Sequence, residues 1–232
     1  MRSRNRFLRF SLGALVLAAT TAAAFGNKTP EAYMASCSSG DDNDCNTIGY
    51  MYQNGVDVPQ DFERARKIFV LSCKHGSATG CYDLGTIYHY GQGVQVDFEG
   101  AAKLYEKSCK GEEITACVNL GGFYEEGTGV AADPAKAAEL FRGACAKPTT
   151  GRTKRHWRTE VVSGGCNRLA DLYERGVGVE QDTARAEILY RKSCGLGNED
   201  ACGNLKNLLK NGPARQAPRV EKKEYSGDGP TR

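Results

Sequence analysis

CYDLGTIYHYGQGVQVDFEGAAKLYEKSCKGEEITA, from Cys81 to Ala116, is one unit of a repeat that occupies most of the chain. Similar units begin at Cys45, Cys117 and Cys166. Two cysteine series make the register visible, because their members recur at an interval of 36 residues. One series is Cys37, Cys73, Cys109 and Cys145; the other is Cys45, Cys81 and Cys117, followed by Cys166 and Cys202. A fixed period of this length predicts a stacked array of structural repeats.

Each unit has the pattern of two helices joined by a glycine loop. Cys81, Leu84, Gly85 and Tyr88 follow the spacing i, i+3, i+4, i+7, which predicts one buried helical stripe. The glycine within that stripe allows a second helix to approach closely. The loop at residues 91–94 ends the first helix, and an acidic residue then opens the second. The opening acids are Asp61, Asp97, Asp133 and Asp182. The pattern therefore predicts an all-α fold.

The N-terminus has the layout of a secretory signal peptide. An apolar run, residues 12–24, follows four arginines and ends in small residues, so we place a cleavage site near Ala24. Removing residues 1–24 takes away four of the 31 basic residues and no acidic one, leaving 27 against 28. We expect a nearly neutral exported chain, periplasmic or secreted, with no membrane anchor and no affinity for nucleic acid. A mitochondrial presequence is the alternative interpretation.

The ten cysteines of this exported chain predict disulfides. Four pairs are separated by eight residues, which on one straight helix would place the Cα atoms about 12 Å apart, too far for a bridge. The chain must therefore turn between them, and the intervening residues are rich in glycine and polar residues. The predicted pairs are Cys37–Cys45, Cys73–Cys81, Cys109–Cys117, Cys145–Cys166 and Cys194–Cys202.

The chain resembles the Sel1-like repeat family, which is related to the tetratricopeptide arrays. The resemblance rests on L-G-x-x-Y, on the G-x-G-V loop and on D-x-x-x-A before an aromatic residue, and its paired cysteines are similar to the secreted cysteine-rich branch. It implies an α/α solenoid of helix-turn-helix repeats stapled by disulfides, over residues 25–211. It also implies binding of proteins, peptides or cell-wall-like ligands on the concave side. Residues 212–232 are rich in proline, glycine and charge, which predicts a disordered tail.

The expected inner-facing positions are one, five and eight residues after the cysteine of each first helix. The predicted concave binding residues are Asn46, Tyr50, Gln53, Tyr82, Thr86, His89, Glu125, Asn167, Asp171 and Glu174, with Val118 and Gly122 at the same positions of the third unit. Their mixture of polar and aromatic side chains suits a recognition groove, although a merely solvated face is an equal alternative.

One corner is longer than the others. Cys145 and Cys166 are 21 residues apart, so we expect an inserted loop at about residues 147–162. This stretch contains Trp157, the single tryptophan of the chain, among basic residues. Arg155, Trp157 and Arg158 are candidate binding residues, because tryptophan and arginine dominate many interfaces. An insertion without function is the alternative.

The sequence offers little support for catalysis. The three histidines, His75, His89 and His156, have no metal-ligand spacing, so we expect neither a metal nor another cofactor. Neither S-x-x-K nor G-x-S-x-G occurs in the chain. We therefore expect a non-enzymatic protein.

These observations lead to one main functional hypothesis and two alternatives. The main one is an exported, monomeric protein-interaction module that binds a protein or peptide, as an envelope factor or an immunity protein against a periplasmic effector. By family analogy alone, the second is a penicillin-binding or weakly β-lactam-hydrolysing protein. The third is an assembly factor of the mitochondrial intermembrane space.

Overall fold

The computed structural model describes residues 28–149 and 156–211, and within these ranges the chain consists of helices and loops. The predicted signal peptide, the predicted disordered tail and Arg155 lie outside the described residues. The helices are α1 (Pro30–Ser38), α2 (Asp42–Asn54), α3 (Phe62–Lys74), α4 (Ala78–Tyr90), α5 (Phe98–Lys110), α6 (Ile114–Glu126), α7 (Pro134–Cys145), α8 (His156–Arg175), α9 (Thr183–Gly195) and α10 (Glu199–Asn211). The all-α prediction is confirmed.

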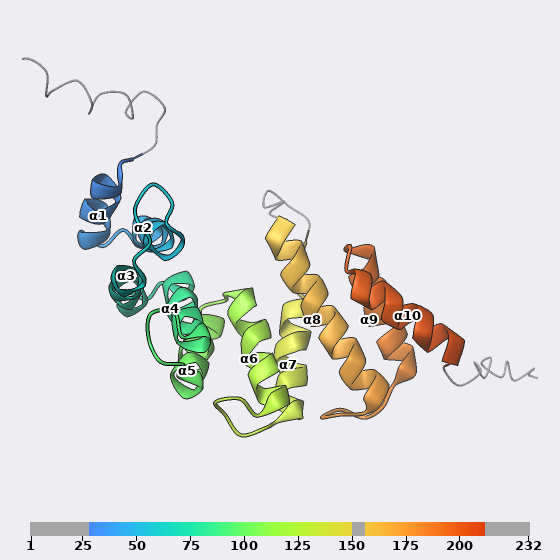
Figure 1. Ribbon diagram of the computed structural model, residues 1–232. Helices are drawn as coiled ribbons and strands as arrows, with labels where there is room; N and C mark the ends of the chain where they lie inside the picture. The colour runs from blue at the N-terminus through green and yellow to red at the C-terminus, as the bar shows by residue number, and fades with distance from the viewer. Residues whose placement is uncertain (1–27, 150–155, 212–232) are drawn as a thin grey trace, which may run out of the picture.

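Consecutive helices form antiparallel hairpins that stack into a solenoid of two layers. The even-numbered helices, α2, α4, α6, α8 and α10, are the first helices of the repeats and form one layer. The odd-numbered helices, α1, α3, α5, α7 and α9, form the other layer. Among the first helices, α2 packs directly on α4 and α6 packs directly on α8, and these two pairs are closer than any pair of successive second helices. The direction of the helix axes changes along the array. In Figure 1, α2 and α3 are seen nearly end-on, whereas α6, α7 and α8 run nearly vertically.

The helix ends follow from local chemistry. The predicted acids open the second helices, because their side chains accept a hydrogen bond from a main-chain N–H one turn on, as between Asp97 Oδ1 and the N–H of Gly100 at 2.8 Å. Glycine ends the first helices in the left-handed conformation, with φ of 64° at Gly91 and 73° at Gly127. These caps set where the helices begin and end, and most of the helices from α2 on are accordingly 13 residues long.

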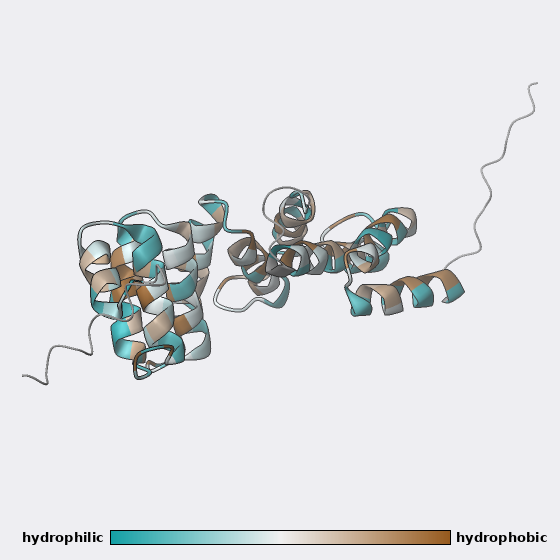
Figure 2. Cartoon of the chain, turned by 90° about the horizontal axis from the view of Figure 1, so that it is seen from above, coloured by the Kyte–Doolittle hydropathy of each residue, from teal (hydrophilic) through white to brown (hydrophobic). Residues whose placement is uncertain are grey.

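One fully buried aromatic ring from each second helix forms the centre of a repeat. These rings are Phe69, Tyr105, Phe141 and Tyr190. A Cβ atom at Gly121 would lie 2.6 Å from Phe141, so the glycine of the first helix permits this close packing. Apolar residues accordingly gather between the helices (Figure 2). Truncating such a ring to alanine typically costs about 3–5 kcal/mol.

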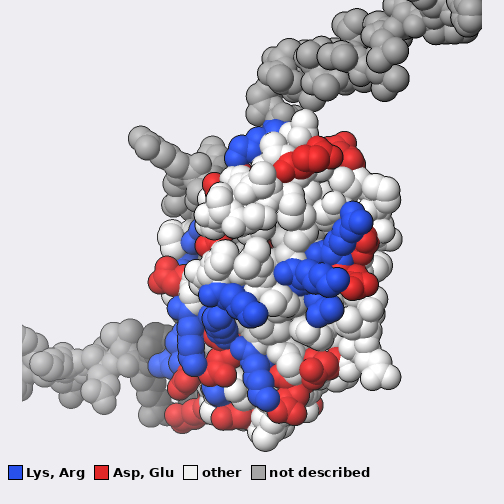
Figure 3. All heavy atoms as spheres, turned by 90° about the vertical axis from the view of Figure 1, so that its left-hand side faces the viewer, with Lys and Arg blue, Asp and Glu red and all other residues white. Residues whose placement is uncertain are grey.

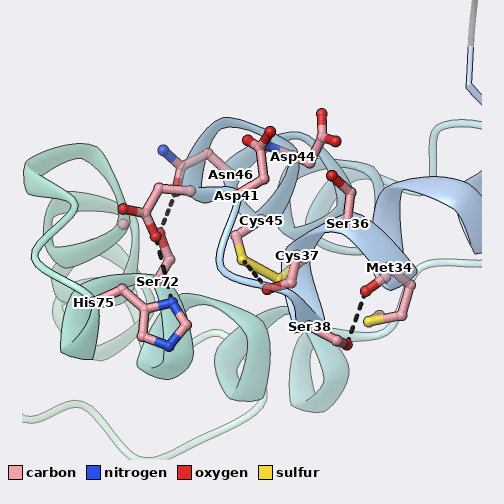
Figure 4. Close-up of a disulfide and its surroundings, with 12 residues drawn as sticks. Met34, Ser36, Cys37, Ser38, Asp41, Asp44, Cys45, Asn46, Ser72 and His75 are labelled. Atoms are coloured by element: carbon pink, nitrogen blue, oxygen red, sulfur yellow. Dashed lines mark hydrogen bonds and ion pairs between the residues drawn. A yellow bond between two sulfur atoms is a disulfide. The ribbon is translucent and has the colours of Figure 1, made fainter.

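The five predicted cysteine pairs are all at disulfide distance, with Cα–Cα separations between 4.5 and 4.7 Å. Four bridges join the end of a second-layer helix to the start of the next first helix, and the fifth, Cys145–Cys166, joins the end of α7 to the middle of α8. In the first corner, Cys45 lies beside Cys37, and Ser72 Oγ of α3 donates to Asn46 Oδ1 of α2 at 2.7 Å (Figure 4). The bridges therefore clamp successive hairpins together.

The long corner differs from its prediction. Residues 156–162, which we expected in an inserted loop, belong to α8, so the described part of the insertion extends a first helix by almost two turns. Trp157 and Arg158 therefore lie on a helix. Val162 is fully buried against the Cys145–Cys166 bridge, which explains why the extension stays helical. Among the helices that the structure describes, none combines the length and apolar character needed to cross a bilayer.

Candidate ligand-binding groove

The predicted concave residues lie along the layer of first helices, where most of them connect one helix to the next. Gln53 Nε2 donates to Gln92 Oε1 at 2.7 Å, and Asn204 Nδ2 donates to Asn167 Oδ1 at 3.2 Å. Tyr190 OH donates to Glu174 Oε2 at 2.8 Å. Much of the predicted recognition surface therefore holds the array together.

Aromatic side chains remain exposed on this layer in the N-terminal half. Tyr50 of α2 is 57% exposed and Tyr90 of α4 is 64% exposed. The ring of His89 stacks on Tyr90, with centroids 4.3 Å apart. Tyr82 is half-buried and packs against Tyr105, so it contributes more to the core than we predicted. Tyr90 was missed because it lies one position beyond the positions that we counted as inner-facing.

A groove of about 400 Å³ runs along α6, between α4 and α8. Such volumes are typical of ligand sites. The lining residues are His89, Phe98, Val118, Asn119, Gly122, Phe123, Glu126, Thr128, Gly164 and Arg168. The predicted inner-facing residues His89, Val118 and Gly122 are among them, which shows that the structure brings these three positions together.

Aromatic rings form one wall of this groove. Phe123 lies 4.8 Å from His89 and 6.1 Å from Phe98, centroid to centroid, in edge-to-face arrangements. His89 Nδ1 is 3.1 Å from the Tyr105 hydroxyl. Burial lowers the pKa of His89, so its imidazole is neutral at neutral pH. The wall is therefore apolar and uncharged.

Arg168 and Glu126 line the other side of the groove and belong to a group of ion pairs that continues beyond it. Arg168 Nη2 lies 2.9 Å from Glu125 Oε2 and 3.6 Å from Glu126 Oε1. Arg175 Nη2 lies 3.3 Å from Glu125 Oε1 and also pairs with Asp171 at 3.0 Å. Glu125, predicted as a binding residue, is thus held between two arginines of α8. At the N-terminal end of the molecule basic and acidic side chains are likewise interspersed (Figure 3).

Asp83, a partly exposed acid of α4, lies near Glu113, the residue that caps α6. Burial, reinforced by the nearby Glu113 carboxylate, raises the pKa of Asp83 to about 7. Burial also raises the pKa of the neighbouring Tyr82 to about 12. The described residues contain no cluster of histidine, cysteine, aspartate or glutamate suited to a metal ion. The features of the groove that suit binding are its hollow form, its aromatic wall and the charged side chains of Arg168 and Glu126.

Sequence reasoning missed several residues of the groove. Phe98 is the first residue of a second helix, and Phe123 and Glu126 fall outside the three counted positions. Arg168 and Asn119 share another repeat position, two residues after the first-helix cysteine. If we had also counted the second position after the cysteine as inner-facing, both residues would have been predicted. This position lies beside the three counted ones on the surface of the helix.

The fold is thus a disulfide-stapled α/α solenoid with a hollow on its layer of first helices. The chain belongs to the Sel1 repeat family, since the Sel1 repeat model matches residues 45–77, 78–112, 114–147 and 163–198. Sel1 repeats generally serve as protein-interaction modules.

Solved structures support the fold. A protective antigen of uropathogenic Escherichia coli strains, which displays an SLR fold, is similar with a TM-score of 0.68 and 28% identity, over 79% of this chain and 36% of that longer chain. A Sel1 repeat protein from Oxalobacter formigenes is similar with a TM-score of 0.66 and 21% identity, over 83% of this chain and 75% of that one. No curated protein matches the chain.

Proposed function

We propose that this chain is an exported, non-enzymatic protein-interaction module whose layer of first helices binds a segment of a partner protein. The groove along α6 carries the proposal, because an apolar hollow with a charged border is the usual form of a recognition site. The exposed rings of Tyr50 and Tyr90 extend the same layer, and exposed tyrosines are enriched at binding interfaces. An adaptor or an effector-immunity protein of the cell envelope is the role that we favour.

Export is supported by the cysteines. All of those in the described residues are paired, and structural disulfides persist in oxidising compartments. N-terminal sequencing of the mature protein tests this part: we expect a start at Phe25 in an exported fraction, whereas an uncleaved chain in the cytosol would contradict it.

Site-specific photo-cross-linking tests the binding surface. A photoreactive phenylalanine replaces Tyr50 or Tyr90 of the first-helix layer, or Ile188 of α9 as the matched control, since Ile188 is 66% exposed on the other layer. Irradiation in an envelope extract should yield the same partner band from positions 50 and 90 and none from position 188. Equal bands from all three positions, or no band from positions 50 and 90, would argue against the proposed surface.

The extension of α8 is a second candidate contact in this proposal. Arg158 is half-buried on that helix, next to Trp157 in the chain. Trp157→Ala should weaken the cross-linked band if the extension contacts the partner. An unchanged band would limit the interface to the layer of first helices.

A further inference from the structure

The groove exists because one repeat position carries no side chain. The fifth position after the first-helix cysteine is Tyr50 in α2, Thr86 in α4 and Asp171 in α8, but Gly122 in α6. A Cβ atom at Gly122 would have a single near neighbour, Arg168 Nη2 at 3.5 Å. No close helix packing therefore requires glycine here, in contrast to Gly121 beside it, and its effect is to leave the floor of the groove open.

The open floor lies beside apolar surface that a ligand can cover. Phe98 is 42% exposed, an unusual state for a ring in contact with the nearly buried Phe123. Val118, one helical turn before Gly122, is half-buried on the same side of α6. A large apolar side chain that covers this surface is removed from water, which favours binding.

The end of the groove at the C-terminus of α6 carries an exposed carboxylate. Glu126 is the last residue of α6, and its side chain is 63% exposed. Arg168 lies closer to Glu125, at 2.9 Å, than to Glu126, at 3.6 Å, so the Glu126 carboxylate remains accessible to a second cation. The carbonyl end of the α6 dipole lies at the same point and also favours positive charge.

We propose that the α6 groove binds a partner segment through one large apolar side chain inserted over Gly122, with an adjacent lysine or arginine at Glu126. This inference rests on the proposed function and specifies the chemistry of the partner. Gly122 determines specificity by its size and Glu126 by its charge. A segment with an acidic residue beside its apolar side chain is disfavoured by the same carboxylate.

Selection of random peptides displayed on phage against the purified full chain tests this chemistry. We expect the enriched peptides to share a large apolar residue next to a lysine or arginine. The best peptide is then synthesised and titrated against the wild type and three variants. Gly122→Tyr supplies the side chain found at the equivalent position of α2, Glu126→Gln removes the charge, and Gly143→Tyr is the matched control.

Gly143 suits the control because it lies on α7 in the other layer, where an added Cβ atom has nothing within 4 Å. We expect Gly122→Tyr to weaken peptide binding by about tenfold or more, because the anchor loses its space. Glu126→Gln should weaken it by about threefold at low salt and less at high salt. Gly143→Tyr should leave affinity unchanged, and thermal unfolding confirms that each variant is folded.

Two results overturn the inference and differ in what they mean for the proposed function. Peptides that bind equally well to Gly122→Tyr, or that share no apolar–basic pair, refute the groove chemistry, while cross-links from positions 50 and 90 would still support a binding layer. An absence of enriched peptides also refutes it, and if those cross-links are missing as well, the proposed function fails with it.

Discussion

The corner closed by Cys73–Cys81 and the corner closed by Cys109–Cys117 occupy equivalent places in successive repeats, yet they are held differently. At the first, Lys107 Nζ of α5 donates to the Cys73 carbonyl at 2.8 Å and Ser108 Oγ donates to the Ala78 carbonyl at 2.7 Å. We call it the tied corner. The later corner at Cys145–Cys166 has the same arrangement from α9, through Lys192 and Ser193 at 2.7 Å each.

The corner at Cys109–Cys117 faces α7, where Gly143 and Ala144 take the places of the lysine and the serine. Neither residue has a side-chain donor, so we call this the untied corner. Its two cysteines are half-buried, whereas Cys73 and Cys81 are only 5% and 1% exposed. Of these two corners, the one that receives side-chain donors from the following helix is also the one better sealed from solvent.

The largest expected effect comes from removing each bridge. Cys109→Ser/Cys117→Ser should lower the free energy of unfolding by about 3 kcal/mol, the loop-closure contribution for this short loop. Cys73→Ser/Cys81→Ser should cost about 1–2 kcal/mol more, because it also leaves serine hydroxyls in a buried corner. Urea denaturation measures both. Equal losses would show that burial of the corner contributes nothing.

A pH effect should distinguish the junction that contains the untied corner, since Asp83 of α4 lies there near Glu113, the N-cap residue of α6. The pKa of Asp83 is about 7 in the folded chain against an ordinary 3.8, so the folded state binds the proton more tightly. The contribution of Asp83 to the free energy of unfolding is therefore greatest below pH 4, and it is lost as the pH rises through 7.

Asp83→Asn should consequently raise the free energy of unfolding by about 2 kcal/mol at pH 8, and the gain should disappear near pH 4. Thermal unfolding across this pH range gives the difference. Asp171→Asn is the control, because Asp171 is exposed enough to pair with Arg175 at 3.0 Å. A gain that does not depend on pH would contradict this explanation.

Reduction should proceed in an order set by burial. We expect the Cys109–Cys117 bridge to react with dithiothreitol on the order of tenfold faster than Cys73–Cys81 or Cys145–Cys166, because thiolate attack requires access to sulfur. Alkylation and peptide mass mapping at successive times measure the order. Simultaneous loss of all bridges would indicate that global unfolding, rather than local access, controls reduction.

The smallest effect concerns the ties themselves. Ser108→Ala should cost about 1 kcal/mol, because it removes a buried hydrogen bond and leaves the Ala78 carbonyl without its side-chain donor. The reciprocal change, Ala144→Ser, tests whether a tie can be added to the untied corner, where it should slow reduction of Cys109–Cys117. If Ser108→Ala does not accelerate reduction of Cys73–Cys81, the ties do not seal the corner.

Much of the architecture follows from local sequence. The period of 36 residues, the acidic caps and the glycine loops predict the helices, because capping and helical spacing act over a few residues. The cysteine pairing follows for the same reason, since eight residues with a turn allow few other partners. The long corner was the exception: residues 156–162 contain no cap that separates loop from helix, and burial of Val162 makes them helical.

The sequence by itself determined the repeat, the bridges and the layer on which the candidate binding residues lie, since each depends on contacts between near neighbours in the chain. Only the tertiary structure decided which of those residues remain free. Gln53 and Asn167 bond to residues of the next repeat and Glu174 bonds to Tyr190 of its own repeat, whereas the open space at Gly122 lies beside Phe98 and Arg168 from two different units. The physical reason is that the groove depends on the curvature with which whole hairpins stack, and that curvature is set by packing between residues far apart in sequence.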